Sequence, residues 1–234
     1  MTLFIGETSL AWEEPQDGLM TARIAFKGAE LADVTQALAQ ALESVGTGGR
    51  LVVDVVLGLQ WCRHLLLPWD ERLVDGELAG SMAWRMFTRC FADPPEAFTL
   101  LLSQSRYRGA QVASFVPGEL IAGLKRLFAV NGISHGRIEP LLSFAWRQLP
   151  CSVEDRASVF MVDESRVLRI EIETGWLTAL DVRPCSHPAD FPPWETAAST
   201  YVYAPEGSLS AYWSRHPVDV SRRCFDYVLY AGGQ

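Results

Sequence analysis

The sequence lacks the signatures of several common protein classes. No segment approaches the ~20 consecutive apolar residues of a membrane-spanning helix, and no basic N-terminal region followed by an apolar run suggests a secretion signal. The five cysteines of this 234-residue chain are scattered without a C-x-x-C pair, which indicates reduced thiols. No G-x-S-x-G, G-x-G-x-x-G or G-x-x-x-x-G-K-S/T motif occurs. We therefore expect a cytoplasmic protein without the usual hydrolase, dinucleotide or P-loop motifs.

Positive charge is also scarce. The chain has 20 Lys and Arg against 28 Asp and Glu, a net charge of −8. This balance argues against nucleic acid as a partner, because such binding needs a basic surface. The four histidines show no H-x-x-H or HExxH spacing, so a zinc site is not expected. The hydrophobic content of 49% with 21% charged residues is that of an ordinary globular protein.

What the sequence does contain is an alternation of strand and helix patterns, which predicts α/β architecture. A three-strand meander is expected in residues 3–27, with a turn at Asp17-Gly18. The predicted helices cover residues 29–45, 77–91, 118–131 and 140–147. The predicted strands cover residues 51–57, 59–67, 98–103, 111–116 and 136–138.

A second meander is predicted after residue 150. Its strands are expected at Val159–Asp163, Arg166–Glu173 and Trp176–Arg183, and they repeat the N-terminal pattern. The polar stretch of residues 150–156 between the two meanders predicts a boundary. We expect residues 1–150 to form a first half with an inserted α/β subdomain, and residues 151–234 to form a second, shortened half. In this half we expect a proline-rich loop at 184–194, strands at 201–203 and 224–230, and a helix at 209–215.

Both meanders open with a hairpin, the first containing Gly6, Thr8 and Ser9 and the second containing Asp163. These hairpins resemble the phosphate loops of the actin-like ATPase superfamily. Such a turn needs glycine for close backbone approach to phosphate, and an acidic residue for Mg²⁺. In the first hairpin, Gly6, Thr8 and Ser9 match the family pattern, and in the second Asp163 matches it. These four residues are the candidate cofactor-binding positions.

The departures from the pattern predict that this site is degenerate. Phe4 stands where the metal-binding aspartate belongs, and Ser165 stands where a second glycine is expected. The turn after Asp163 is too short to encircle a phosphate. Gly232-Gly233 matches a late adenosine motif but falls at the last residues of the sequence. We therefore expect no cofactor, and we disfavour Mg-ATP.

The order of segments resembles PilM and the cytoplasmic part of GspL, the actin-like assembly proteins of type IV pili and type II secretion. The resemblance rests on three stretches and on Arg183 at the end of its strand: Leu65-Leu66-Leu67-Pro68, Asn131-Gly132-Ile133 and Ile138-Glu139-Pro140. It covers most of residues 1–183. It implies an actin-like (RNase H-like) duplicated body with mixed sheets and packed helices.

The same resemblance implies a function. The leading hypothesis is a non-catalytic cytoplasmic scaffold, peripheral to the inner membrane at its cytoplasmic face. Its partners would be the cytoplasmic tail or domain of an inner-membrane pilus or secretion protein, and a motor ATPase. One alternative is an ATP-binding PilM-like protein whose nucleotide gates partner binding. Another is an enzyme on an RNase H-like scaffold, for which Glu7, Asp54 and Asp163 are the available carboxylates.

Other candidate residues have simpler structural interpretations. Asp54 in an apolar strand is expected to face solvent at an edge, and Asp163 is expected to cap its own tight turn. Cys62 and His64 are two apart and would share a strand face, where a core cysteine beside a half-exposed histidine is commoner than a nucleophilic pair. The basic hairpin tip Arg106-Tyr107-Arg108 is expected to be a solvated turn, with an acidic partner surface as the alternative.

Overall fold

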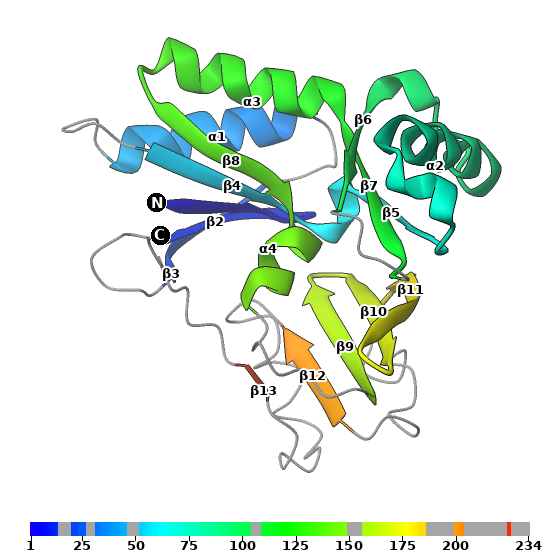
Figure 1. The fold of residues 1–234 in the computed structure, drawn as a ribbon. Coiled ribbons are helices and arrows are strands. Elements are labelled where there is room, and N and C mark those ends of the chain that lie inside the picture. The colour runs from blue at the N-terminus through cyan, green and yellow to red at the C-terminus, as the bar shows by residue number, and fades with distance from the viewer. Residues whose placement is uncertain are drawn as a thin grey trace.

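The structure is a computed structural model that describes residues 1–13, 20–26, 31–45, 52–103, 109–148, 156–185, 199–203 and 224–225. This part of the chain forms three β-sheets with helices packed against them (Figure 1). Among the helices of the described residues, none combines the length and apolar character needed to cross a membrane.

Sheet A has the strand order β3-β2-β1-β4-β8. Its strands are β1 (Thr2–Ile5), β2 (Ser9–Glu13), β3 (Met20–Ala25), β4 (Val52–Leu57) and β8 (Ser134–Pro140). The first three form an antiparallel meander, whereas β4 runs parallel to β1 and β8 runs parallel to β4. The predicted meander and the strands near residues 51–57 and 136–138 are therefore confirmed.

Helices α1 (Leu31–Val45) and α3 (Gly118–Val130) cover one face of sheet A (Figure 1). Their apolar residues recur at helical spacing and lie in one core with the inward side chains of the strands. The buried residues of this core include Val34, Leu38 and Ala41 of α1, Leu120, Leu124 and Phe128 of α3, and Leu3, Ile5, Val53, Val55 and Leu57 of the sheet. This packing fixes the strands that carry the first hairpin turn.

Sheet B has the order β5-β7-β6 and is antiparallel. It contains β5 (Arg63–Leu67), β6 (Phe98–Leu102) and β7 (Gln111–Pro117), with α2 (Gly76–Cys90) packed on it through Ala79, Ala83 and Phe87. Three 3₁₀ turns connect these elements: η1 (Leu59–Trp61), η2 (Glu71–Val74) and η3 (Pro95–Ala97). Sheet B and α2 thus form a separate small layer beside sheet A.

The predicted strand 59–67 is wrong over its first residues, because η1 occupies them. The Trp61 N–H bonds the carbonyl of Gly58 at 3.1 Å and closes a 3₁₀ turn. The Leu59 N–H instead donates to the Asp163 carboxylate, 104 residues away in sequence. A tertiary hydrogen bond therefore replaces the ladder bond that the apolar pattern predicts.

Sheet C repeats the topology of sheet A with the order β11-β10-β9-β12-β13. Its strands are β9 (Arg156–Asp163), β10 (Arg166–Glu173), β11 (Trp176–Pro184), β12 (Ser199–Tyr203) and β13 (Cys224–Phe225). Again an antiparallel meander is followed by two parallel strands. The repeated meander predicted from the sequence is confirmed as part of a duplicated architecture.

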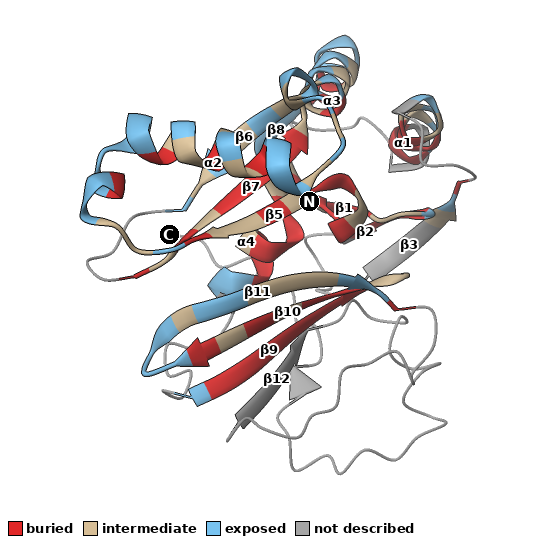
Figure 2. Ribbon diagram, turned by 90° about the vertical axis from the view of Figure 1, so that its right-hand side faces the viewer, coloured by how far each residue is buried: buried red, intermediate tan, exposed pale blue. Residues whose placement is uncertain are grey.

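Helix α4 (Leu141–Gln148) lies between sheets A and C (Figure 1). A second core joins the three elements, and Figure 2 shows its buried residues along α4, β9 and β10. Its members include Leu141, Leu142, Phe144 and Ala145 of α4, Phe4, Ala11 and Val56 of sheet A, and Val159, Met161, Leu168 and Ile170 of sheet C. The two repeated sheets therefore share one apolar core.

Several predictions fall outside the described residues. They concern the Asp17-Gly18 turn, the Arg106-Tyr107-Arg108 tip, most of the boundary at 150–156, most of the loop at 184–194, the helix at 209–215 and the Gly232-Gly233 pair. The division into residues 1–150 and 151–234 stays a prediction.

Candidate functional site

The two hairpin turns face each other where sheets A and C meet. The turn between β1 and β2 contains Gly6, Glu7 and Thr8, and the turn between β9 and β10 contains Glu164 and Ser165. The Thr8 N–H donates to Glu164 Oε2 at 2.6 Å, and the Thr8 hydroxyl donates to the same oxygen at 3.0 Å. The Ser9 hydroxyl donates to Glu164 Oε1. The second turn thus places a carboxylate among three donors of the first.

A reciprocal contact runs in the opposite direction. The Ser165 hydroxyl donates to Glu7 Oε2, so each turn supplies a glutamate to the other. The two turns approach closely at Gly6, because an added Cβ would lie 2.7 Å from Glu164 Oε1 and 3.3 Å from the Ser9 carbonyl oxygen, so the glutamate side chain would have to shift. The Trp61 indole Nε1–H donates to the Gly6 carbonyl at 2.8 Å and holds the turn from the other side.

Asp163 lies beside these turns and is buried. Its Oδ2 accepts the Leu59 N–H at 2.7 Å, and an added Cβ on Gly58 would overlap that oxygen. Burial raises the pKa of Asp163 to about 6. The Leu59 hydrogen bond opposes this rise in pKa, the charges of Glu164 and Glu7 add to it, and the charge of Arg166 opposes it. Asp163 therefore binds the backbone of the other sheet region, in place of the predicted cap of its own turn.

Phe4 occupies the position where the family pattern has its metal-binding aspartate. Its side chain is buried in the core shared by sheets A and C, and its ring meets the ring of Phe144 edge-on at a centroid distance of 5.4 Å. An apolar contact thus stands where a nucleotide-bound metal would need an oxygen ligand. With Glu164 already bound to the donors of the first turn, the residues present do not fit Mg-ATP.

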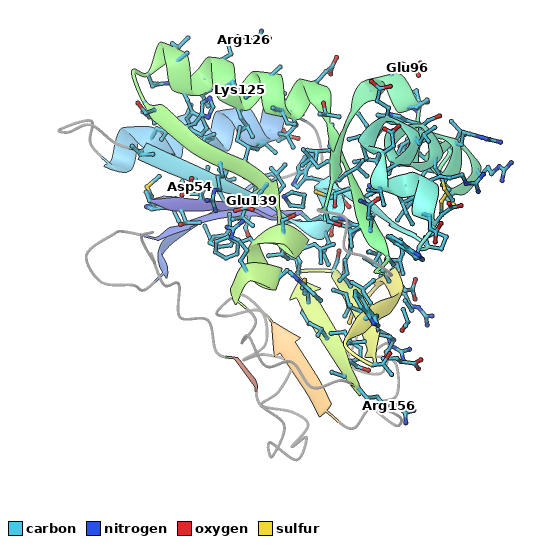
Figure 3. All side chains as sticks on the ribbon, in the orientation of Figure 1. Asp54, Glu96, Lys125, Arg126, Glu139 and Arg156 are labelled. Carbon is cyan, nitrogen blue, oxygen red and sulfur yellow. The ribbon has the colours of Figure 1, made fainter. Side chains whose placement is uncertain are left out.

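The three carboxylates of the enzyme alternative do not come together. Glu7 and Asp163 lie at the paired turns, but Asp54 pairs with Thr2, three residues before the end of β1 and so about 10 Å along the strand. Asp54 Oδ1 accepts the Arg137 N–H at 2.6 Å, where the pairing of β4 with β8 is irregular. Glu139 of β8 pairs with Val56, two residues along β4 from Asp54 (Figure 3). The described residues contain no group of three or more His, Cys, Asp or Glu side chains that could hold a metal ion.

Cys62 and His64 are both buried, so the histidine is not half-exposed as predicted. Burial raises the pKa of the Cys62 thiol, and burial lowers the pKa of His64 to about 4. His64 Nδ1 lies 2.9 Å from the Ser114 hydroxyl oxygen. With the thiol and the imidazole both neutral, neither is an activated nucleophile, and Cys62 lies in the apolar core of sheet A.

The sequence does not single out two participants of this site, Glu164 and Leu59. The position of Glu164 in its hairpin is a clue to its role. It is the first of the two turn residues between Asp163 of β9 and its partner Arg166 of β10. Hairpin turns of that length favour Gly, Asn or Asp. A glutamate there indicates a contact beyond the turn. Leu59 participates through its backbone, which no residue pattern reveals.

Comparisons with known proteins bear on the fold. No family model matches the chain, and no curated protein matches it in sequence. Two solved structures resemble it over most of its length. The cytoplasmic domain of EpsL, an inner-membrane component of the type II secretion system of Vibrio cholerae, aligns with a TM-score of 0.55 and 11% identity, over 87% of this chain and 81% of that one. A Bacteroides thetaiotaomicron protein of actin-like ATPase fold and unknown function aligns with a TM-score of 0.56 and 8% identity, over 92% and 85%.

This chain has an actin-like fold. The repeated strand order of sheets A and C agrees with that assignment, and so does the similarity to the PilM-PilN type IV pilus biogenesis complex. That alignment has a TM-score of 0.50 and 15% identity, and it covers 79% of this chain and 61% of the other. The predicted fold class is confirmed. At these identities the likeness concerns the fold alone.

Proposed function

We propose that this protein is a non-catalytic actin-like scaffold in the assembly of a type IV pilus or a type II secretion system. It works by recognition at the cytoplasmic face of the inner membrane. Its partners are the cytoplasmic tail or domain of an inner-membrane component, and a motor ATPase. The similarity in fold to the EpsL cytoplasmic domain and to the PilM-PilN complex supports this choice of machine.

The observation that carries the non-catalytic part of the proposal is the burial of Phe4 against Phe144. A metal-dependent nucleotide reaction needs a hard oxygen ligand at this position. Replacing the phenylalanine by a carboxylate would bury a charge in the core of two sheets. Phe4 is therefore part of the core, and a position that packs in the core does not hold a catalytic metal.

One observation favours the second candidate, an ATP-binding protein whose nucleotide gates partner binding. The first turn keeps Gly6, and the Thr8 N–H and the hydroxyls of Thr8 and Ser9 all donate to a carboxylate, that of Glu164. Titration calorimetry of the wild-type protein with Mg-ATP separates the two candidates. We expect no heat of binding and no hydrolysis. Micromolar binding with turnover would overturn the scaffold proposal. Binding without turnover that also protects the amides of residues 6–9 from hydrogen exchange would favour the gated alternative.

The partners are tested by co-purification. The tagged chain is expressed in its native host, and membranes are solubilised before capture. We expect an inner-membrane pilus or secretion protein among the captured proteins, and its loss on competition with an excess of untagged chain. Capture of the same proteins by an unrelated tagged actin-like body would show that the association is not specific, and would remove the support for this role.

A further inference from the structure

A groove runs between helices α1 and α3, which lie side by side on one face of sheet A (Figure 1). It has a volume of about 560 Å³. Short residues line it from both helices: Ala32 and Thr35 of α1, and Ala122 and Gly123 of α3. Because the side chains at a contact set the distance between packed helices, this groove can accept another helix at close range.

Apolar surface in this groove is uncovered. Val130, at the C-terminal end of α3, has an exposed fraction of 80%, the highest among the large apolar side chains of the described residues. Leu127, one turn earlier, is half-buried and also lines the groove. Covering these side chains with another apolar surface is favourable.

Two opposite charges lie on the same side of α3. Glu119 and Arg126 both line the groove, and their spacing of seven residues places them two turns, about 10 Å, apart along the helix. Both are exposed, and within the described part of the chain neither has an ion-pair partner. The midpoint between them falls between Ala122 and Gly123.

This spacing is self-complementary. If a second α3 lies antiparallel to the first about a two-fold axis at the midpoint, Glu119 of each copy faces Arg126 of the other. The short residues Ala122 and Gly123 then lie at the crossing point, where the two helix axes come closest. Another protein would need an acidic and a basic group at this same separation, whereas a second copy supplies them by symmetry.

We propose that the groove between α1 and α3 is a self-association surface, and that its occupant is α3 of a second copy of this chain. The two α3 helices are antiparallel, and two ion pairs between Glu119 and Arg126 fix their register. Surface ion pairs add little affinity but determine orientation, so the dimer is weak and specific. This inference goes beyond the proposed scaffold function and does not depend on it.

Charge reversal tests the register. We expect the wild-type chain to show a monomer–dimer equilibrium in sedimentation velocity over a concentration range of about 5–500 µM. Glu119→Arg leaves two basic groups in the groove, and Arg126→Glu leaves two acidic ones. Since symmetry makes each substitution change both contacts, either variant alone should have a dimer Kd at least about tenfold above that of the wild type.

A mixture of the two variants is the sharper measurement. When Glu119→Arg and Arg126→Glu are mixed, every contact between unlike copies joins a basic and an acidic group. A heterodimer should therefore form, with a Kd within about threefold of the wild-type value. Both variants keep a net negative charge, so general attraction between them cannot produce this recovery.

Two further variants serve as controls. Lys125→Glu makes the same change of charge as Arg126→Glu at a neighbouring residue of α3 that does not line the groove (Figure 3), and it should leave the Kd unchanged. Ala122→Gln lengthens the side chain at the crossing point without adding charge, and it should weaken dimerisation at little cost in helix propensity. Thermal unfolding checks that each variant is folded.

Several results would overturn the proposal. A wild-type chain that stays monomeric up to about 500 µM would do so. So would charge-reversal variants that dimerise as well as the wild type, or a mixture that recovers no association. If the chain is monomeric alone and a co-purified membrane protein protects the α3 amides from hydrogen exchange, the groove belongs to that partner and the proposal fails.

Discussion

At the scale of the residue, Asp163 combines a buried carboxylate with a hydrogen bond from the Leu59 N–H. Its pKa is raised from 3.8 to about 6, with burial as the largest cause. A folded-state pKa above the unfolded value means that the folded state binds the proton more tightly. The associated stability is fully present below about pH 4 and is lost as the pH rises through about 6.

Asp163→Asn removes this titration while keeping an acceptor for Leu59. We expect the free energy of unfolding of the wild type to fall, relative to Asp163→Asn, by on the order of 2–3 kcal/mol between pH 4 and pH 8. Urea denaturation at several pH values measures this difference. Glu96→Gln, on the exposed surface of η3 (Figure 3), is the control, and its curve should run parallel to the wild type. A constant difference between Asp163→Asn and the wild type would contradict the expectation.

At the scale of the element, the sequence predicts the helices of the described residues and the two meanders well because their apolar residues recur at the right period. Predicted helix 118–131 is α3, and its stop at Asn131-Gly132 is confirmed by the bond from the Ile133 N–H to the Phe128 carbonyl at 2.9 Å. These features follow from local pattern.

The contacts between distant elements were not predictable in the same way. η1 differs from the predicted strand because its first N–H binds Asp163, and no pattern within residues 59–67 encodes that partner. The candidate residues Gly6, Thr8, Ser9 and Asp163 do gather at one place, as the resemblance to phosphate loops implies. Their partner Glu164 is not predicted. The phosphate-loop pattern describes residues that bind a phosphate from solution, whereas here the bound group is a carboxylate of the same chain.

At the scale of the whole molecule, the core around α4 joins the two repeated sheets. Phe144 is buried between them and meets Phe4 edge-on. Because side chains of both sheets contact the same helix, unfolding of one sheet exposes apolar surface of the other. The described parts of sheets A and C are therefore expected to unfold together.

Phe144→Ala tests this coupling. We expect a loss of about 3–5 kcal/mol in the free energy of unfolding, from lost burial and the cavity left behind. Hydrogen exchange should show the loss in the amides of β1 and β9 together. Trp146→Ala is the matched control on the same helix, since its side chain is 39% exposed, and it should cost about 1 kcal/mol or less. Increased exchange confined to one of the two strands would mean that the sheets unfold independently.

Because the Trp61 indole donates a hydrogen bond to the Gly6 carbonyl, we expect the fluorescence of Trp61 to report on the state of this turn. Trp61 is buried, and its polar edge binds the turn that holds the Glu164 carboxylate. If that carboxylate is removed, we expect water to reach the indole and the emission of Trp61 to shift to longer wavelength. The two turns can thus be followed by fluorescence in the unlabelled protein, provided that the other tryptophans are replaced by phenylalanine.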